Sequence, residues 1–206
     1  MNWLAHLLLS EAKVEHRLGN LLGDLTKGKE RTNLSNEILR GIADHQKIDI
    51  FTDSHPIVKQ SKQRIDCQYR RFSGILVDIF YDHILANNWH NYSDIPLEGF
   101  ASEIYISFEP YLEHIPVKAS SVIKRAIADN WLTSYRDLDG IEQALQRISW
   151  KLTRRRNKYF NLCPAIEELT TNYQDLETDF KLFFPELIQH MQCYQMEVVS
   201  NRISDK

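Results

Sequence analysis

Histidine and aspartate side chains recur at helical spacing in the first 83 residues of this 206-residue chain. On a helix over residues 38–53, His45 and Asp49 share the face of Ile38 and Ile42. Burying both polar groups without partners would be costly. A metal ion would satisfy them, because side chains at i and i+4 project from one helix face. The alternative is a buried His–Asp hydrogen bond that only fixes packing.

A second helix, predicted over residues 74–89, is apolar on nearly every side and should be central. Asp78 and Asp82 are one turn apart on it, and His83 falls in its apolar face. His83 alone would fit a core histidine whose hydrogen bonds are satisfied. Three polar groups on one buried helix favour a site.

Two further polar groups belong to apolar or glycine-rich stretches. His6 lies within the run from Leu4 to Leu9, and Asp24 directly follows Gly23. A carboxylate beside a glycine can approach an ion closely, although Asp24 would equally suit the end of a turn or helix. The full candidate set is His6, Asp24, His45, Asp49, Asp78, Asp82 and His83.

Imidazoles and carboxylates without cysteine suit Mn²⁺, Fe, Mg²⁺ or Zn²⁺. Such an ion would lower the pKa of a bound water and orient it toward a phosphorus atom, and a nearby carboxylate would take the water's proton. Asp82 and His83 resemble the His-Asp pair of HD-type metal phosphohydrolases in reversed order.

Seven glycines and six prolines are few for this length and favour helices with short connections. Asn33 or Ser35 should cap the helix over 38–53, and Pro56 should end it. Arg40, Asp44 and Lys47 should face solvent on its far side. We expect a basic exposed helix over 58–71, two or three helices over 95–151 and one or two over 163–199. Residues 1–206 are therefore predicted to form one all-α domain, a helical bundle.

Composition and the absence of certain motifs exclude several classes of protein. A net charge of −3 gives no bulk attraction to nucleic acid, and no window is apolar enough to span a membrane. Three dispersed cysteines without a CxxC motif indicate a reducing compartment, and the first residues lack a basic signal-peptide region, so we expect a cytoplasmic protein. Motifs of P-loop proteins, GxSxG hydrolases and HExxH proteases are absent. A helix-turn-helix DNA binder would have no use for a buried His/Asp set.

Six stretches resemble the acyl carrier protein phosphodiesterase family, which is described as divergent HD-type hydrolases. They are residues 1–9 (MNWLAHLLL), 19–24 (GNLLGD), 41–53, 70–89, 131–141 and 175–187. The resemblance implies an HD-domain-like fold and hydrolysis of holo-acyl carrier protein (holo-ACP) to apo-ACP and 4′-phosphopantetheine. It also implies dependence on Mn²⁺, with Mg²⁺ or Fe²⁺ as alternatives.

Carried over by position, the resemblance makes Asp24, His45, Asp78 and His83 the principal catalytic and metal-binding residues. Asp49 and Asp82 would be ligands or would orient ligands, and His6 is a weaker candidate.

An acidic carrier needs basic docking residues on a protein of negative net charge. The candidates are Arg64, Arg70 and Arg71, which precede the second helix, and Arg154, Arg155 and Arg156. Two alternative functions are an HD-type phosphohydrolase of a small phosphoester or nucleotide, and a carrier-binding module without catalysis.

Overall fold

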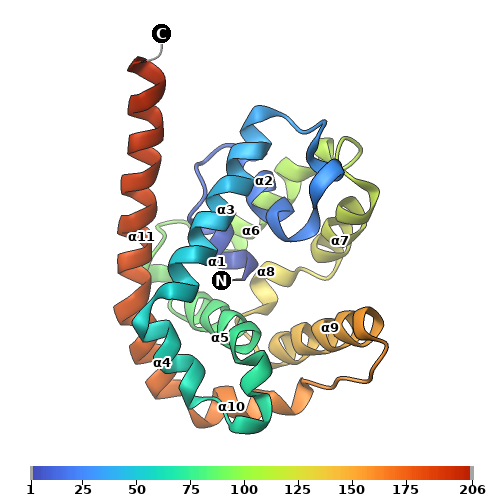
Figure 1. The fold of residues 1–206 in the computed structure, drawn as a ribbon, viewed down its shortest axis with the longest axis vertical. Coiled ribbons are helices and arrows are strands. Elements are labelled where there is room, and N and C mark those ends of the chain that lie inside the picture. Colours follow the sequence, from blue (N-terminus) through green and yellow to red (C-terminus); the bar gives the residue numbers. More distant parts are fainter. Residues whose placement is uncertain (1, 205–206) are drawn as a thin grey trace.

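The computed structural model describes residues 2–204, and side chains up to residue 197; within this part the chain is helical and contains no strand, which confirms the all-α prediction (Figure 1). The helices are α1 (Trp3–Leu8), α2 (Val14–Leu25), η1 (Gly28–Arg31), α3 (Asn36–Ser54), α4 (Pro56–Arg64), η2 (Cys67–Phe72), α5 (Ser73–Asn87), η3 (Trp89–Asn91), α6 (Leu97–Phe108), η4 (Glu109–Tyr111), α7 (Val117–Ala128), α8 (Trp131–Ser134), α9 (Leu138–Arg156), η5 (Cys163–Ala165), α10 (Ile166–Thr171) and α11 (Tyr173–Ser204).

The limits of α3 follow from local chemistry. Ser35 is its N-cap, and the Ser35 hydroxyl accepts a hydrogen bond from the backbone N–H of Ile38 at 3.2 Å. The helix ends at Ser54, two residues before Pro56. Both predictions are confirmed, with Ser35 rather than Asn33 as the cap.

The basic segment after Pro56 differs from its prediction. It is not one helix over 58–71, because α4 ends at Arg64 and the short helix η2 follows. The guanidinium of Arg64 pairs with Asp175 and Asp179 of α11, each at 2.8 Å. Asp179 is buried, so this pairing ties α4 to α11 and leaves Arg64 a structural rather than a docking role.

Helices α2 and α3 pack with their backbones in direct contact. A Cβ atom on Gly19 would collide with the carbonyl of Ile38, and one on Gly41 would collide with the carbonyl of His16. Glycines at these two crossing points allow an approach that a side chain would prevent. The facing side chains of α2 and α3 are thereby brought within hydrogen-bonding reach.

The centre of the molecule is α5, as its sequence predicts. Leu76, Val77, Phe80 and Tyr81 of α5 are fully buried. The long helix α11 runs along one side of the molecule and packs against α3, α4 and α5 (Figure 1). Among the described residues, every helix is too short or too polar to span a lipid bilayer.

Candidate metal centre

Four of the predicted side chains meet where α1, α2 and α3 converge. His6 Nε2 lies 3.2 Å from Asp49 Oδ1, and His45 Nε2 lies 3.1 Å from Asp49 Oδ2. Asp24 Oδ1 is 3.4 Å from His45 Nε2. The two imidazoles stack, with ring centroids 4.1 Å apart and planes 19° from parallel. Asp49 therefore bridges two histidines, and Asp24 reaches one of them from the other side.

The protonation of His6 is set by its neighbours. Its Nδ1 lies 2.8 Å from Asn20 Oδ1, and the Asn20 amide is oriented by its donation to Ser10 Oγ at 2.8 Å. Since Asn20 Oδ1 only accepts, His6 Nδ1 carries the proton and donates it. The lone pair of His6 then lies on Nε2, the atom directed at the centre. A metal-binding histidine is oriented in this way by a partner behind the ring.

The residues fit a divalent cation. His6 Nε2 is buried without an aligned hydrogen-bond partner, although a carboxylate oxygen is within ion-pair distance. One donor atom each from His6, His45 and Asp49 lies within 4.8 Å of the others. Two nitrogens and carboxylate oxygens are borderline-to-hard ligands that suit Mn²⁺, Fe²⁺ or Zn²⁺.

The pKa values of the two histidines of the centre are shifted in opposite directions. Burial lowers the pKa of His6 despite its contact with Asp49. Burial also opposes protonation of His45, but the carboxylates of Asp24 and Asp49 raise the pKa of His45 to about 9. The same contacts lower the pKa values of Asp24 and Asp49, against the effect of burial. Without metal, one proton on His45 thus neutralises part of the carboxylate charge, and a cation would replace it.

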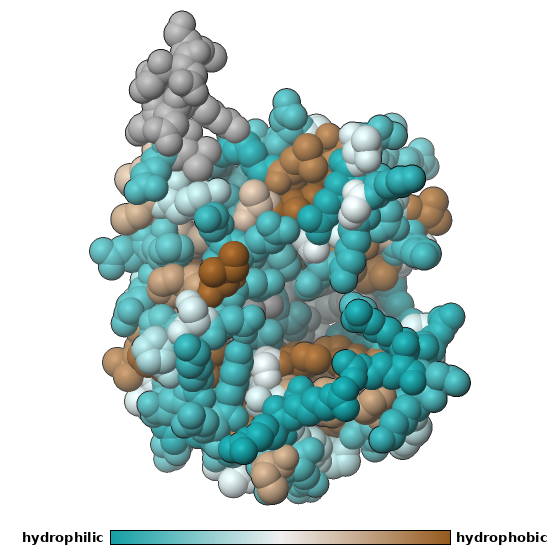
Figure 2. Space-filling model, in the orientation of Figure 1, coloured by the Kyte–Doolittle hydropathy of each residue, from teal (hydrophilic) through white to brown (hydrophobic). Residues whose placement is uncertain are grey.

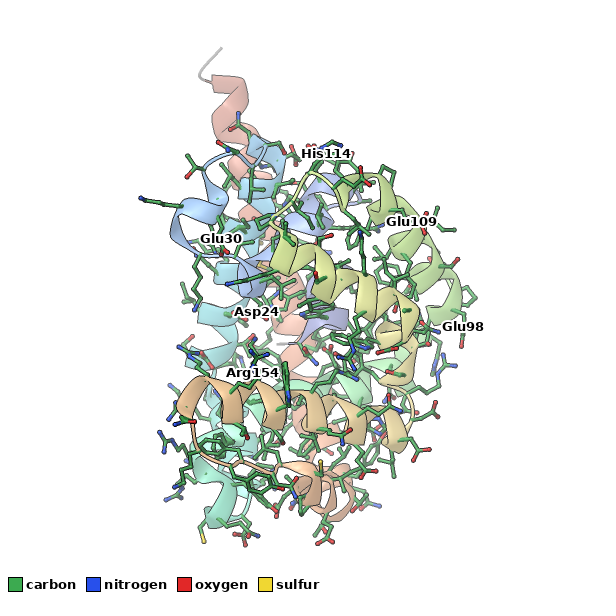
Figure 3. All side chains as sticks on the ribbon, turned by 90° about the vertical axis from the view of Figure 1, so that its right-hand side faces the viewer. Asp24, Glu30, Glu98, Glu109, His114 and Arg154 are labelled. Atoms are coloured by element: carbon green, nitrogen blue, oxygen red, sulfur yellow. The ribbon has the colours of Figure 1, made fainter. Side chains whose placement is uncertain are left out.

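The centre has a buried end and an open end. The side chains of His6 and His45 are 1% and 6% exposed, whereas that of Asp24 is 51% exposed. Figure 2 shows this face of the molecule hollowed between an upper and a lower lobe. Figure 3, turned by 90° from that view, shows Asp24 above Arg154 of α9. A substrate would approach the centre from the side of Asp24.

Two predicted site residues have other roles. Asp82 is fully buried and accepts hydrogen bonds from the backbone N–H groups of Leu4, at 2.7 Å, and Ala5, at 3.2 Å. It therefore caps the first turn of α1 from outside that helix. His83 Nδ1 lies 2.8 Å from the carbonyl oxygen of Tyr135, which fits the core-histidine alternative.

Asp78 lies one turn before Asp82 on α5, and its charge contributes to raising the pKa of Asp82. In the part of the chain that the structure describes, the group of possible ligand atoms within 4.8 Å of one another comprises His6, His45 and Asp49 and does not include Asp78. The structure thus brings together Asp24, His45, Asp49 and His6 and separates Asp82 and His83 from them.

The expectation that Asp44 faces solvent is wrong. Asp44 is 5% exposed, and its Oδ2 lies 3.2 Å from Nε2 of the fully buried His16. Gln195 of α11 donates to the same oxygen at 3.0 Å. The sequence held a signal for this pair, because His16, Asn20 and Asp24 are spaced four residues apart and line one face of α2.

The structure is that of an all-α protein with a histidine–carboxylate centre. Comparison with known proteins identifies its family. The sequence model described as acyl carrier protein phosphodiesterase matches residues 1–187. Proteins of that name from Pectobacterium atrosepticum and Yersinia pestis are each 32% identical over 197 residues, 95% of this chain and 100% of theirs. One from Photorhabdus laumondii is 30% identical over 203 residues, 98% of this chain and 96% of its own.

The chain therefore belongs to the acyl carrier protein phosphodiesterase family. No solved structure matches it, so the HD-domain-like part of the fold prediction stays a prediction.

Gly23 controls the position of His45, because a Cβ atom at Gly23 would collide with Cγ of the His45 ring. We expect Gly23→Ala to push this ring out of place and to weaken Mn²⁺ binding at least tenfold, as measured by calorimetry. Gly74→Ala is the matched control, since its Cβ would have only ordinary contact with Lys62 at 3.6 Å. Equal metal affinity in both variants would contradict this role of Gly23.

Asp82→Ala should lower the free energy of unfolding by about 2–4 kcal/mol, because two buried N–H groups lose a carboxylate acceptor. Chemical denaturation measures the change. A variant as stable as the wild type would show that Asp82 does not anchor α1.

Burial raises the pKa of Asp82 to about 7. Between pH 4 and 7 the folded protein therefore binds more protons at this site than the unfolded chain, whose carboxyl has a pKa of about 3.9. This site then makes stability fall as pH rises through that range. We expect the stability of Asp82→Asn relative to the wild type to increase from pH 5 to pH 8.

Proposed function

We propose that this protein hydrolyses the phosphodiester that joins 4′-phosphopantetheine to holo-ACP, releasing apo-ACP and 4′-phosphopantetheine. The proposal rests on one observation: His6, His45, Asp49 and Asp24 converge in a chain that aligns over nearly its whole length with proteins named acyl carrier protein phosphodiesterase. A binding module would have no need of stacked, buried imidazoles bridged by a half-buried carboxylate.

A divalent cation, Mn²⁺ in this proposal, would be held by His6, His45 and Asp49. When bound it supplies Lewis acidity, which activates water and offsets charge on the phosphoryl oxygens. Asn20 keeps the His6 lone pair on Nε2, and Asp49 fixes the separation of the two rings. The exposed carboxylate of Asp24 stands at the open end, where it takes the proton of the attacking water.

The two remaining basic clusters provide a surface for an acidic carrier. Arg70 and Arg71 lie on η2, and Arg154, Arg155 and Arg156 form the last turn of α9. The end of η2 contacts the loop that follows α9, because the ring of Phe72 lies edge-on to that of Phe160 with centroids 5.5 Å apart. The two clusters thus lie on neighbouring segments of the fold, and Arg154 lies on the side of the molecule that also shows Asp24 (Figure 3).

We place the reaction in the cytoplasm, where carriers are used and cysteines stay reduced. Cys67, Cys163 and Cys193 are all free thiols in the structure, as a reducing compartment allows.

The direct test is intact-mass analysis of holo-ACP incubated with the protein and Mn²⁺. We expect the carrier to lose the mass of phosphopantetheine, and a chelator or His45→Ala to abolish the loss. An unchanged carrier mass with folded, metal-loaded protein would refute the proposal. Turnover of a small phosphodiester in that case would favour the general phosphohydrolase.

Charge reversal tests docking. We expect Arg70→Glu with Arg71→Glu to raise KM for holo-ACP at least tenfold while metal content stays at the wild-type level, because complementary charge steers the encounter. The matched control reverses Lys118 and Lys124, two exposed lysines of α7. KM should also rise steeply with ionic strength. Equal kinetics in both double variants would contradict the docking surface.

A further inference from the structure

Arg147 of α9 is a half-buried cation with an unusual set of contacts. Its guanidinium carbon lies over the ring of Trp131, 4.0 Å from the ring centroid, as in a cation–π contact. Among the described residues, no carboxylate oxygen lies within ion-pair distance of it. Burial accordingly lowers the pKa of Arg147, and Tyr135 and Asp129 only partly offset this effect.

Other arginines that are partly buried have partners for their charge. Arg17 pairs with Glu103 at 2.6 Å, and Arg64 pairs with two aspartates. Arg31 donates to the carbonyl oxygens of Gly23 and Thr26. Arg147 has the neutral side chain of Tyr135 as a hydrogen-bond partner, which does not balance its charge as a carboxylate would. A partly desolvated guanidinium whose charge is not balanced is costly, unless an anion supplied from outside completes it.

The position of Arg147 connects it with the candidate metal centre. The ring of Trp131 also contacts that of Trp3, with centroids 5.4 Å apart. Trp3 begins α1 and precedes His6 by three residues, so the two side chains are neighbours on that helix. Asn2 donates a hydrogen bond to Tyr135 Oη at 2.9 Å, which links the residue after α8 to the start of α1.

We propose that Arg147, held flat by Trp131, binds the phosphoryl oxygens of the substrate. The planar fork of a guanidinium matches two oxygens of one phosphate group, and stacking on an aromatic ring fixes the plane of that fork. This inference rests on the proposed phosphodiesterase function, because it assigns Arg147 to the phosphate of that substrate. Arg147 is distinct from the docking arginines, which face the carrier protein.

The kinetic test compares Arg147→Gln with the wild type, both loaded with Mn²⁺. We expect kcat/KM to fall roughly 100-fold for holo-ACP and for bis(4-nitrophenyl) phosphate alike, since both present the same phosphodiester. Arg147→Lys, which keeps the charge but loses the fork, should recover only part of the rate. Arg17→Gln is the matched control: Arg17 lies over the ring of Phe100 but already has a carboxylate partner, and its loss should leave both rates unchanged.

The second readout does not depend on catalysis. Inorganic phosphate is titrated into chelator-treated full-length protein, and tryptophan fluorescence reports binding beside Trp131. We expect a saturable change whose Kd rises at least tenfold in Arg147→Gln and stays constant in Arg17→Gln. Phosphate binding that depends on Arg147 in a protein that leaves holo-ACP intact would support this site and refute the proposed function.

Two outcomes overturn the inference while the proposed function stands. In the first, Arg147→Gln cleaves holo-ACP and binds phosphate as the wild type does. In the second, it loses activity on holo-ACP alone, with wild-type activity on the small diester and wild-type phosphate binding. Arg147 would then contact a carboxylate of the carrier. If Arg147→Gln fails to fold, Arg147→Lys is subjected to the same measurements and decides the question.

Discussion

The site depends on how closely α2 and α3 approach one another. Gly19 and Gly41 lack the Cβ atoms that would collide with the backbone of the facing helix, and Gly23 leaves room for the His45 ring. This approach sets Asp24 of α2 within 3.4 Å of His45 on α3. It also accounts for Gly19 and Gly23, which serve packing, whereas Gly28 has a positive φ of 52° and no close neighbour.

The centre places two carboxylates close together, and the side chains of the protein balance their negative charge only in part. Asp49 and Asp24 face one protonated imidazole, while His6 is kept neutral by burial and by Asn20. Such an arrangement is costly without a cation. The cost is tolerated because the surrounding elements fix each side chain: Asp82 anchors the start of α1, and Ser35 fixes the start of α3.

The parts of this structure that sequence could predict are those fixed by neighbours along the chain. The cap at Ser35, the break at Pro56 and the shared face of His45 and Asp49 all follow from spacings of two to four residues. Asp82 and His83 carried a signal just as strong, yet their partners are backbone groups 78 and 52 residues away. Sequence spacing shows that a polar group is buried, but it does not distinguish a ligand from a cap.

The same distinction applies to the arginines, which sequence alone grouped by proximity. Arg64 looked like Arg70, but two aspartates of α11 neutralise it. Arg147 belongs to no basic cluster or motif in the sequence. In the structure it is half-buried against Trp131, whose ring contacts Trp3 on the helix that holds His6. A structural arginine has its charge balanced by carboxylates inside the fold, whereas a docking arginine is exposed on the surface. A substrate-binding arginine is partly buried and has no carboxylate partner in the protein. That property is set by tertiary contacts, so it becomes visible only once α9 is packed against α8 and the ring of Trp131 on α8 against that of Trp3 on α1.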